Sequence, residues 1–155
     1  MSRLPLVIAG IALALAACSD DGGSAVADDA EASEEIAEAV LVEVHEALGL
    51  GDEVEELGSV TEGCVDSLGR DTGETQGRAH SRADPGVVSP ERFESVGERL
   101  GATDVRASDV QDPFDTDKVI GRRISVFADH SGRRVTVTMQ LTDEAFSASV
   151  RAACP

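Results

Sequence analysis

The sequence predicts an α+β domain in which two helices pack on one face of an antiparallel sheet. Two segments repeat their apolar residues at three- and four-residue spacing, as a helix with one buried stripe requires. The last third of the chain instead alternates apolar and polar residues, as half-buried strands do. The order of one helix, two extended segments, a second helix and three strands is typical of the α+β class.

The first predicted helix spans about residues 34–48. Ser33 is its expected N-cap, acidic residues fill its first turn, and Gly49 and Gly51 follow its end. Its buried stripe is predicted from the apolar residues Ile36, Val40, Leu41, Val44 and Leu48. Residues 60–68 and 74–83 are interpreted as two extended segments that glycines interrupt.

A second, shorter helix follows a predicted turn at residues 84–86. Ser89 is its expected cap and Pro90 its first residue, and Gly101 ends it. Its apolar face is predicted from Phe93, Val96 and Leu100. The polar stretch that follows, residues 109–117, is interpreted as a loop.

The last third of the chain predicts a three-stranded antiparallel meander. Gly132 is expected to take a positive φ at a bulge in its first turn, residues 129–132. One face is expected to be wet, and the other is available to the two helices. The residues predicted to face the helices are Ile120, Ile124, Val126, Ala128, Val135, Val137, Met139, Leu141, Phe146, Ala148, Val150, Ala152 and Cys154.

The first 17 residues predict a secretory signal. Arg3 precedes an uncharged apolar run over residues 4–17, which is the order of regions found in export signals. As a helix this run would be about 21 Å long, shorter than the roughly 30 Å hydrocarbon core of a bilayer. We therefore expect cleavage rather than a permanent membrane span.

The residues at the expected cleavage point resemble the lipobox of bacterial lipoproteins. Leu15, Ala16 and Ala17 stand directly before Cys18. The resemblance implies that the Cys18 thiol receives a diacylglyceryl group, that residues 1–17 are removed, and that the new amine is acylated with a fatty acid such as palmitate. It implies a protein held at the bacterial cell membrane, outside the cytoplasm. An ordinary signal peptide followed by an incidental cysteine is the alternative.

The mature chain is expected to divide into an acidic tether, residues 18–33, and a single domain, residues 34–155. The tether has almost no large apolar residues, so it is expected to stay flexible. Its random-coil reach would be on the order of 20 to 25 Å. In length, tether, cysteines and strand-rich C-terminus the chain is similar to small actinobacterial lipoproteins of uncharacterised function, a likeness that implies no active site.

Cys64 and Cys154 remain as an even pair once Cys18 is assigned to lipid. In an oxidising location such a pair predicts a disulfide. Neither cysteine has another Cys or a His nearby at a ligand-like spacing, which argues against a catalytic or metal-binding thiol.

Charge is distributed unevenly along the chain. Residues 19–69 carry 16 acidic side chains and no Lys or Arg, whereas residues 70–155 carry 14 acidic and 12 basic side chains. The acidic part would repel phosphates, so no nucleic-acid partner is expected. Two interpretations of it stay open: a solvated surface, or a docking face for a basic protein or a cation.

The sequence contains no motif for a hydrolase nucleophile or for nucleotide phosphates, and it indicates no cofactor. His45, His80 and His130 are far apart, and His45 is expected at the surface with a favoured positive charge. Weak candidates for Ca²⁺ ligands lie in the polar stretch, although their spacing fits no EF-hand and a solvated loop is the alternative. These candidates are Asp109, Asp112, Asp115 and Asp117.

Together these observations predict a non-enzymatic, lipid-anchored module that binds another envelope or exported protein through its sheet face or its acidic half. The alternative is an inhibitor or immunity-type protein that neutralises a basic enzyme or toxin, since strong negative charge would speed that encounter. A small-molecule carrier or an enzyme is a further alternative, and either would need a pocket that the sequence does not indicate.

Overall fold

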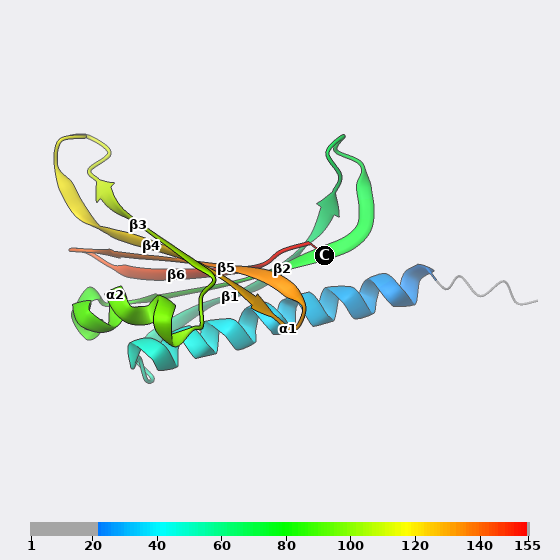
Figure 1. The fold of residues 1–155 in the computed structure, drawn as a ribbon, viewed down its shortest axis with the longest axis horizontal. Coiled ribbons are helices and arrows are strands. Elements are labelled where there is room, and N and C mark those ends of the chain that lie inside the picture. Colours follow the sequence, from blue (N-terminus) through cyan, green and yellow to red (C-terminus); the bar gives the residue numbers. More distant parts are fainter. Residues whose placement is uncertain (1–21, 155) are drawn as a thin grey trace, which may run out of the picture.

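The computed structural model describes residues 22–154, which form two helices and a six-stranded sheet (Figure 1). The helices are α1 (Gly22–Leu48) and α2 (Pro90–Arg99). Every pair of neighbouring strands is antiparallel, in the order β1-β2-β6-β5-β4-β3. The strands are β1 (Val54–Val65), β2 (Asp71–Ala83), β3 (Asp104–Gln111), β4 (Val119–His130), β5 (Arg133–Thr142) and β6 (Phe146–Ala152).

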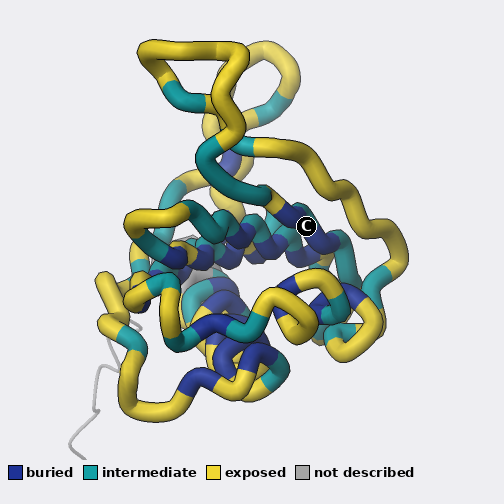
Figure 2. Tube along the Cα trace, turned by 90° about the vertical axis from the view of Figure 1, so that its left-hand side faces the viewer, coloured by how far each residue is buried: buried dark blue, intermediate teal, exposed yellow. Residues whose placement is uncertain are grey.

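Both helices lie on the same face of the sheet, which confirms the predicted α+β class (Figure 1). The buried residues lie between the helices and that face and form one core (Figure 2). The two rings of Phe93 and Phe146 meet edge to face there, with 6.5 Å between their centroids. Most of the meander residues that were predicted to face the helices are buried, namely Ile124, Val126, Val135, Val137, Met139, Phe146, Ala148, Val150 and Ala152.

The helix α1 begins at Gly22, not at residue 34, so the prediction of Ser33 as an N-cap is wrong. Ser33 is fully buried within the helix, and residues 22–33 of the expected tether are helical. Composition misled the prediction because this part of α1 is held by polar contacts rather than by large apolar side chains. A Cβ atom on Gly77 of β2 would lie 1.9 Å from the Ser33 carbonyl oxygen, so only glycine allows this approach. The lipobox cysteine and residues 1–17 lie outside the described residues.

The strand β3 was not expected: residues 104–108 had no predicted structure, and residues 109–111 were interpreted as the start of a polar loop. It is an edge strand that pairs only with β4, and most of its side chains are exposed. An edge strand that buries neither face leaves no alternation of apolar and polar residues to recognise.

The β4–β5 hairpin has the predicted position but a different turn. His130 pairs with Arg133 in an unbroken register, and both Ser131 and Gly132 have positive φ, of 50° and 80°. Two such residues between paired strands form a type I′ turn, so the expected bulge is absent from this hairpin. The positive φ of Gly132 is confirmed.

Two hairpins rise from the sheet on the side away from the helices (Figure 1). We call residues 62–74 the β1–β2 arm and residues 109–120 the β3–β4 arm. Both arms also stand above the helical layer in the perpendicular view (Figure 2). Among residues 22–154, no helix is long and apolar enough to cross a membrane.

Candidate binding face of the sheet

The candidate site is the face of the sheet that no described element covers, which we call the open face. It lies between the two arms and opposite the helices (Figure 1). Side chains alternate across a strand, so the buried residues of the core also identify the outward ones. On the three central strands the outward residues are Arg78, His80, Arg82, Arg134, Thr136, Thr138, Gln140, Ser147, Ser149 and Arg151. None of these is acidic.

The strand register arranges these residues in three rows that run from β2 to β3. The middle row has small hydroxyl side chains at its centre: His80, Ser149, Thr138, Ser125 and Arg106 are successive neighbours. One flanking row consists of Arg78, Arg151, Thr136, Phe127 and Asp104, and the other of Arg82, Ser147, Gln140, Arg123 and Ser108. We call the short side chains Ser149, Thr138 and Ser125 the hydroxyl floor. Arginines lie in the rows on both sides of this floor.

A hydrogen-bonded network fixes the β1 side of the open face. The Nε of Arg151 donates to the Oε1 of Gln76 at 2.6 Å, and the Nε2 of Gln76 donates to Glu62 at 2.8 Å. Arg78 pairs with the same Glu62 carboxylate at 3.1 Å, while its buried Nε has no partner. The network holds Arg78 and Arg151 in place on one side of the hydroxyl floor.

Three other arginines on the open face form no ion pair within residues 22–154, although Glu55 lies opposite Arg82 and Asp129 lies opposite Arg134 in the strand register. The three are Arg82, Arg123 and Arg134, all exposed, and Arg123 donates only to the Gln140 side chain, at 3.1 Å. Arg106 pairs with Asp104 at 2.9 Å and lies over the ring of Phe127. Altogether, six of the eleven arginines within residues 22–154 face this way, in a protein whose net charge is −17.

Each arm carries exposed apolar side chains. Phe114, in the β3–β4 arm, is 98% exposed, and Leu68, in the β1–β2 arm, is 74% exposed. Val65 in the β1–β2 arm and Val119 in the β3–β4 arm are also exposed. The open face is thus polar and basic at its centre and has apolar groups at its two ends.

The four aspartates proposed as weak Ca²⁺ candidates lie along the β3–β4 arm, where they hold the chain and its neighbours. Asp109 pairs with Arg122 at 2.8 Å, and Asp112 accepts a hydrogen bond from the Phe114 amide at 2.9 Å. That amide bond holds the pKa of Asp112 below its usual value; burial acts to raise this pKa, and the charge of Lys118 adds to the lowering. Asp115 accepts from the Asp117 amide at 3.3 Å. Within the described part of the chain, no three His, Cys, Asp or Glu side chains are grouped closely enough to hold a metal ion.

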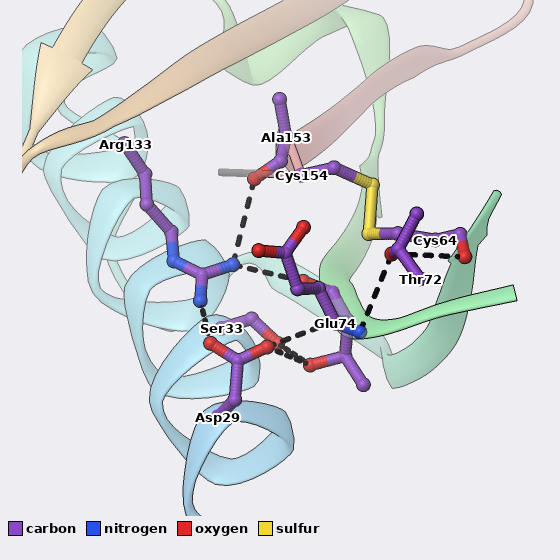
Figure 3. Close-up of polar contacts among 9 residues, drawn as sticks. Asp29, Ser33, Cys64, Thr72, Glu74, Arg133, Ala153 and Cys154 are labelled. Carbon is purple, nitrogen blue, oxygen red and sulfur yellow. Dashed lines mark hydrogen bonds and ion pairs between the residues drawn. A yellow bond between two sulfur atoms is a disulfide. The ribbon is translucent and has the colours of Figure 1, made fainter. Parts of the chain in front are cut away.

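A disulfide joins Cys64 and Cys154, as predicted, with 6.0 Å between the two Cα atoms (Figure 3). It connects the base of the β1–β2 arm to the chain just beyond β6. Thr72, across the arm from Cys64, donates to the Cys64 carbonyl oxygen at 3.2 Å. The disulfide therefore fixes the base of one of the two arms.

Beside the disulfide, α1 is joined to the sheet through Asp29 and Arg133 (Figure 3). Asp29 pairs with Arg133 and accepts from the amide and hydroxyl of Thr75, at 2.8 and 2.9 Å. Arg133 also donates to the Thr75 carbonyl oxygen at 2.8 Å. The hydroxyl of Ser33 lies 3.1 Å from that of Thr75. Because Asp29 belonged to the expected tether, the sequence analysis missed this junction.

Replacement of Asp29 by asparagine should make the protein less stable at neutral pH. Partial burial acts to raise the pKa of Asp29, but the hydrogen bonds from Thr75 and the charge of Arg133 outweigh it and hold that pKa below its usual value of 3.8. A lowered carboxyl pKa stabilises the fold above pH 3.8, and this stabilisation is lost as the pH falls through the lowered value.

We expect Asp29→Asn to lower the free energy of unfolding by about 1 to 2 kcal/mol at pH 7, and by less at pH 3. Urea unfolding at the two pH values measures this difference. Glu31→Gln, at an exposed position of the same helix, is the control and should change little. An equal effect of Asp29→Asn at both pH values would show that the ion pair contributes nothing.

The histidines do not form a common site. His45 is buried and its Nε2 lies 2.8 Å from the Ser81 hydroxyl, so the expectation of a charged surface histidine is wrong. Burial lowers the pKa of His45, although the negative charge of Glu56 acts against this. His80 lies on the open face, and His130 lies 4.0 Å from Glu43 of α1.

The solvent side of α1 has the opposite character from the open face. Its exposed positions include Glu31, Glu35, Glu38, Glu43 and Glu46. The charge asymmetry of the sequence therefore becomes an asymmetry between two sides of the fold, with an acidic helical side and a basic centre of the open face.

Only part of the open face could be predicted from the sequence. The polar residues of β5 and β6, among them Arg134 and Arg151, alternate with core residues and were expected to be wet. The contribution of β2 was missed because Arg78, His80 and Arg82 alternate with the small residues Gly77, Ala79 and Ser81 rather than with large apolar ones. The arms were missed because their rise from the sheet is set by the tertiary structure.

Comparison with known proteins supports the fold and no more. The chain matches no family model, and no curated protein matches it. A crystal structure of a DUF4853 family protein from Actinomyces odontolyticus is similar, with a TM-score of 0.52 and 20% sequence identity. The match covers 79% of this chain and 64% of that one, so the chain spans just under two thirds of its structural neighbour. The fold is therefore shared with an actinobacterial protein of a family of unknown function.

Proposed function

We propose that this protein is a lipid-anchored extracytoplasmic lipoprotein whose open face binds another envelope or exported protein without catalysis. The observation that carries the proposal is a sheet face that the described residues leave uncovered, flanked by two arms with exposed apolar side chains. Exposed apolar groups beside a polar surface are typical of protein-binding sites. The disulfide and the Asp29–Arg133 junction support this use, because they hold one arm and its neighbouring helix in fixed positions.

The lipobox supports the anchor at Cys18. Only residues 19–21 separate Cys18 from the first residue of α1. Even a fully extended chain covers at most about 14 Å over this distance. The folded part would then stand close to the membrane surface, rather than at the end of the longer tether that composition suggested.

Site-directed photo-crosslinking in cells tests the proposal. A photoreactive residue replaces Thr138 at the centre of the open face, and a matched variant carries it in place of Ala39, an exposed residue of α1. We expect one defined protein adduct from position 138 and none from position 39. Growth with labelled palmitate should label the protein, and Cys18→Ser should remove the label. Adducts at both positions, or at neither, would contradict the binding role of the open face.

The acidic side of α1 favours a second candidate, an inhibitor or immunity-type protein that binds a basic enzyme or toxin. Exposed glutamates along one helix would speed the association with a basic surface. The same experiment separates the two functions, because the second predicts an adduct from position 39 and none from position 138.

A further inference from the structure

We infer that the open face binds an acidic, extended peptide segment of its partner, which runs diagonally across the strands from one arm toward the other. This inference rests on the proposed function and specifies the chemistry of the partner. It is carried by three features of the open face: its charge, the arrangement of its rows and its apolar ends.

The charge of the open face is the first feature. The chain carries 30 acidic and 13 basic residues, yet the outward positions of the three central strands include four arginines and no acid. Arg82, Arg123 and Arg134 form no ion pair within the described chain, although the strand register places Glu55 opposite Arg82 and Asp129 opposite Arg134. The six arginines of the open face still outnumber its outward acids, which are Glu55, Glu62, Asp104 and Asp129. This local excess of positive charge in a strongly acidic protein is complementary to an anionic partner.

The rows of side chains are the second feature. Ser149, Thr138 and Ser125 form the hydroxyl floor, with Arg78 and Arg151 on one side and Arg82 and Arg123 on the other. Residues two apart on a strand are separated by roughly 6.6 Å, so the arginines of both flanking rows lie within a side-chain length of the middle row. Arg78 and Arg151 contact Glu62 and Gln76 in the protein alone. The guanidinium group pairs with carboxylates in a two-pronged geometry, and the hydroxyl groups can hydrogen-bond a peptide backbone.

The dimensions of the floor agree with a short segment. Crossing from β2 to β3 covers four strand spacings, or roughly 19 Å. An extended peptide covers this distance with about six residues. The two arms lie at opposite ends of the strands, so a segment that reaches both of them runs diagonally and is longer than this.

The apolar ends of the open face favour a polypeptide over an anionic phosphate polymer. Phe114 and Leu68 expose most of their surface at the two arms. A protein can bury these side chains against its own apolar groups, whereas a chain of phosphates has none to offer.

Fluorescence anisotropy with labelled decaglutamate and the full-length protein tests the inference. The test variant is Arg82→Glu/Arg151→Glu, which reverses one exposed arginine in each flanking row. The matched control is Arg92→Glu/Arg99→Glu, which makes the same change in charge at exposed positions of α2. Circular dichroism checks that both variants fold.

We expect the wild-type protein to bind decaglutamate and to bind it more weakly as salt increases. The open-face variant should bind at least about tenfold more weakly, and the α2 variant should stay within about twofold of the wild type. Absence of binding to the wild type, or an equal loss in both variants, would overturn the inference. Binding of polyphosphate of matched charge without binding of decaglutamate would overturn it in favour of a phosphate polymer.

Failure of this inference can be told from failure of the proposed function. If decaglutamate does not bind but position 138 still forms its protein adduct in cells, the open face binds a protein by other chemistry. If position 138 forms no adduct, the proposed function itself is wrong, whether or not decaglutamate binds.

Discussion

Removal of the disulfide by Cys64→Ala/Cys154→Ala should lower the free energy of unfolding by about 4 to 5 kcal/mol, because a 90-residue closure is lost. In the chain-entropy model, the bond stabilises the fold because it restricts the conformational freedom of the unfolded chain. Such a loss is a large part of the roughly 5 to 15 kcal/mol that stabilises a typical domain. Urea unfolding of the full-length protein measures it.

The structure adds a local effect to this global one. Because Cys64 lies at the base of the β1–β2 arm, amide hydrogen exchange over residues 62–74 should increase more than exchange in the β3–β4 arm. Cys18→Ser is the matched control, since it removes a cysteine that forms no part of this disulfide, and it should leave stability unchanged. A loss below about 1 kcal/mol in the double variant would mean that the closure contributes far less than the chain-entropy estimate.

Replacement of Gly77 by alanine should have the second largest effect, a loss of about 3 kcal/mol. The added Cβ would lie 1.9 Å from the Ser33 carbonyl oxygen and 2.7 Å from the Glu34 amide nitrogen, both of which are backbone atoms of α1. The helix must therefore move away from β2. Exchange of the α1 amides should increase more than exchange in α2.

Gly63→Ala is the matched control for this prediction. Gly63 lies in the neighbouring strand β1, a Cβ there meets no atom within 4 Å, and its φ is not positive. This change should leave stability equal or slightly higher, since alanine loses less backbone freedom on folding than glycine. Equal stability of the two variants would contradict the close packing of α1 against β2.

The helices and the meander were predictable because each buries one face. In α2 the cap position, the first-position proline and the apolar triplet all agree, and in β5 and β6 large apolar residues alternate with polar ones. Such patterns arise wherever burial alone decides the structure. The disulfide was predictable because the assignment of Cys18 to lipid left Cys64 and Cys154 as a single pair in an oxidising location.

The first half of α1 and the strand β3 were not predictable for the opposite reason. Ser33 and Asp29 are held by Thr75 and Arg133, which are 42 and 104 residues away, and no local pattern reveals such partners. The strand β3 is defined by its backbone pairing with β4 while its side chains stay in solvent. The polar contacts of α1 and the backbone pairing of β3 both form only when distant parts of the chain come together in the fold.

The charge of the candidate site could not be predicted from the sequence either. The acidic first half of the sequence suggested a basic partner, but the fold places many of those acids on α1, others on β1 and its arm, and exposes arginines on the central strands of the sheet. The sign of the charge at the proposed binding face is therefore opposite to that of the whole chain. The net charge of the chain thus did not predict the charge of its candidate site.

Arginine modification with phenylglyoxal, followed by mass spectrometry, tests most directly whether the open face is the binding surface. The protein is labelled alone and in complex with the partner identified by crosslinking. We expect the partner to protect Arg82, Arg123, Arg134 and Arg151, while Arg99 on α2 reacts as before. Protection of Arg99 with continued reaction of the open-face arginines would contradict this account.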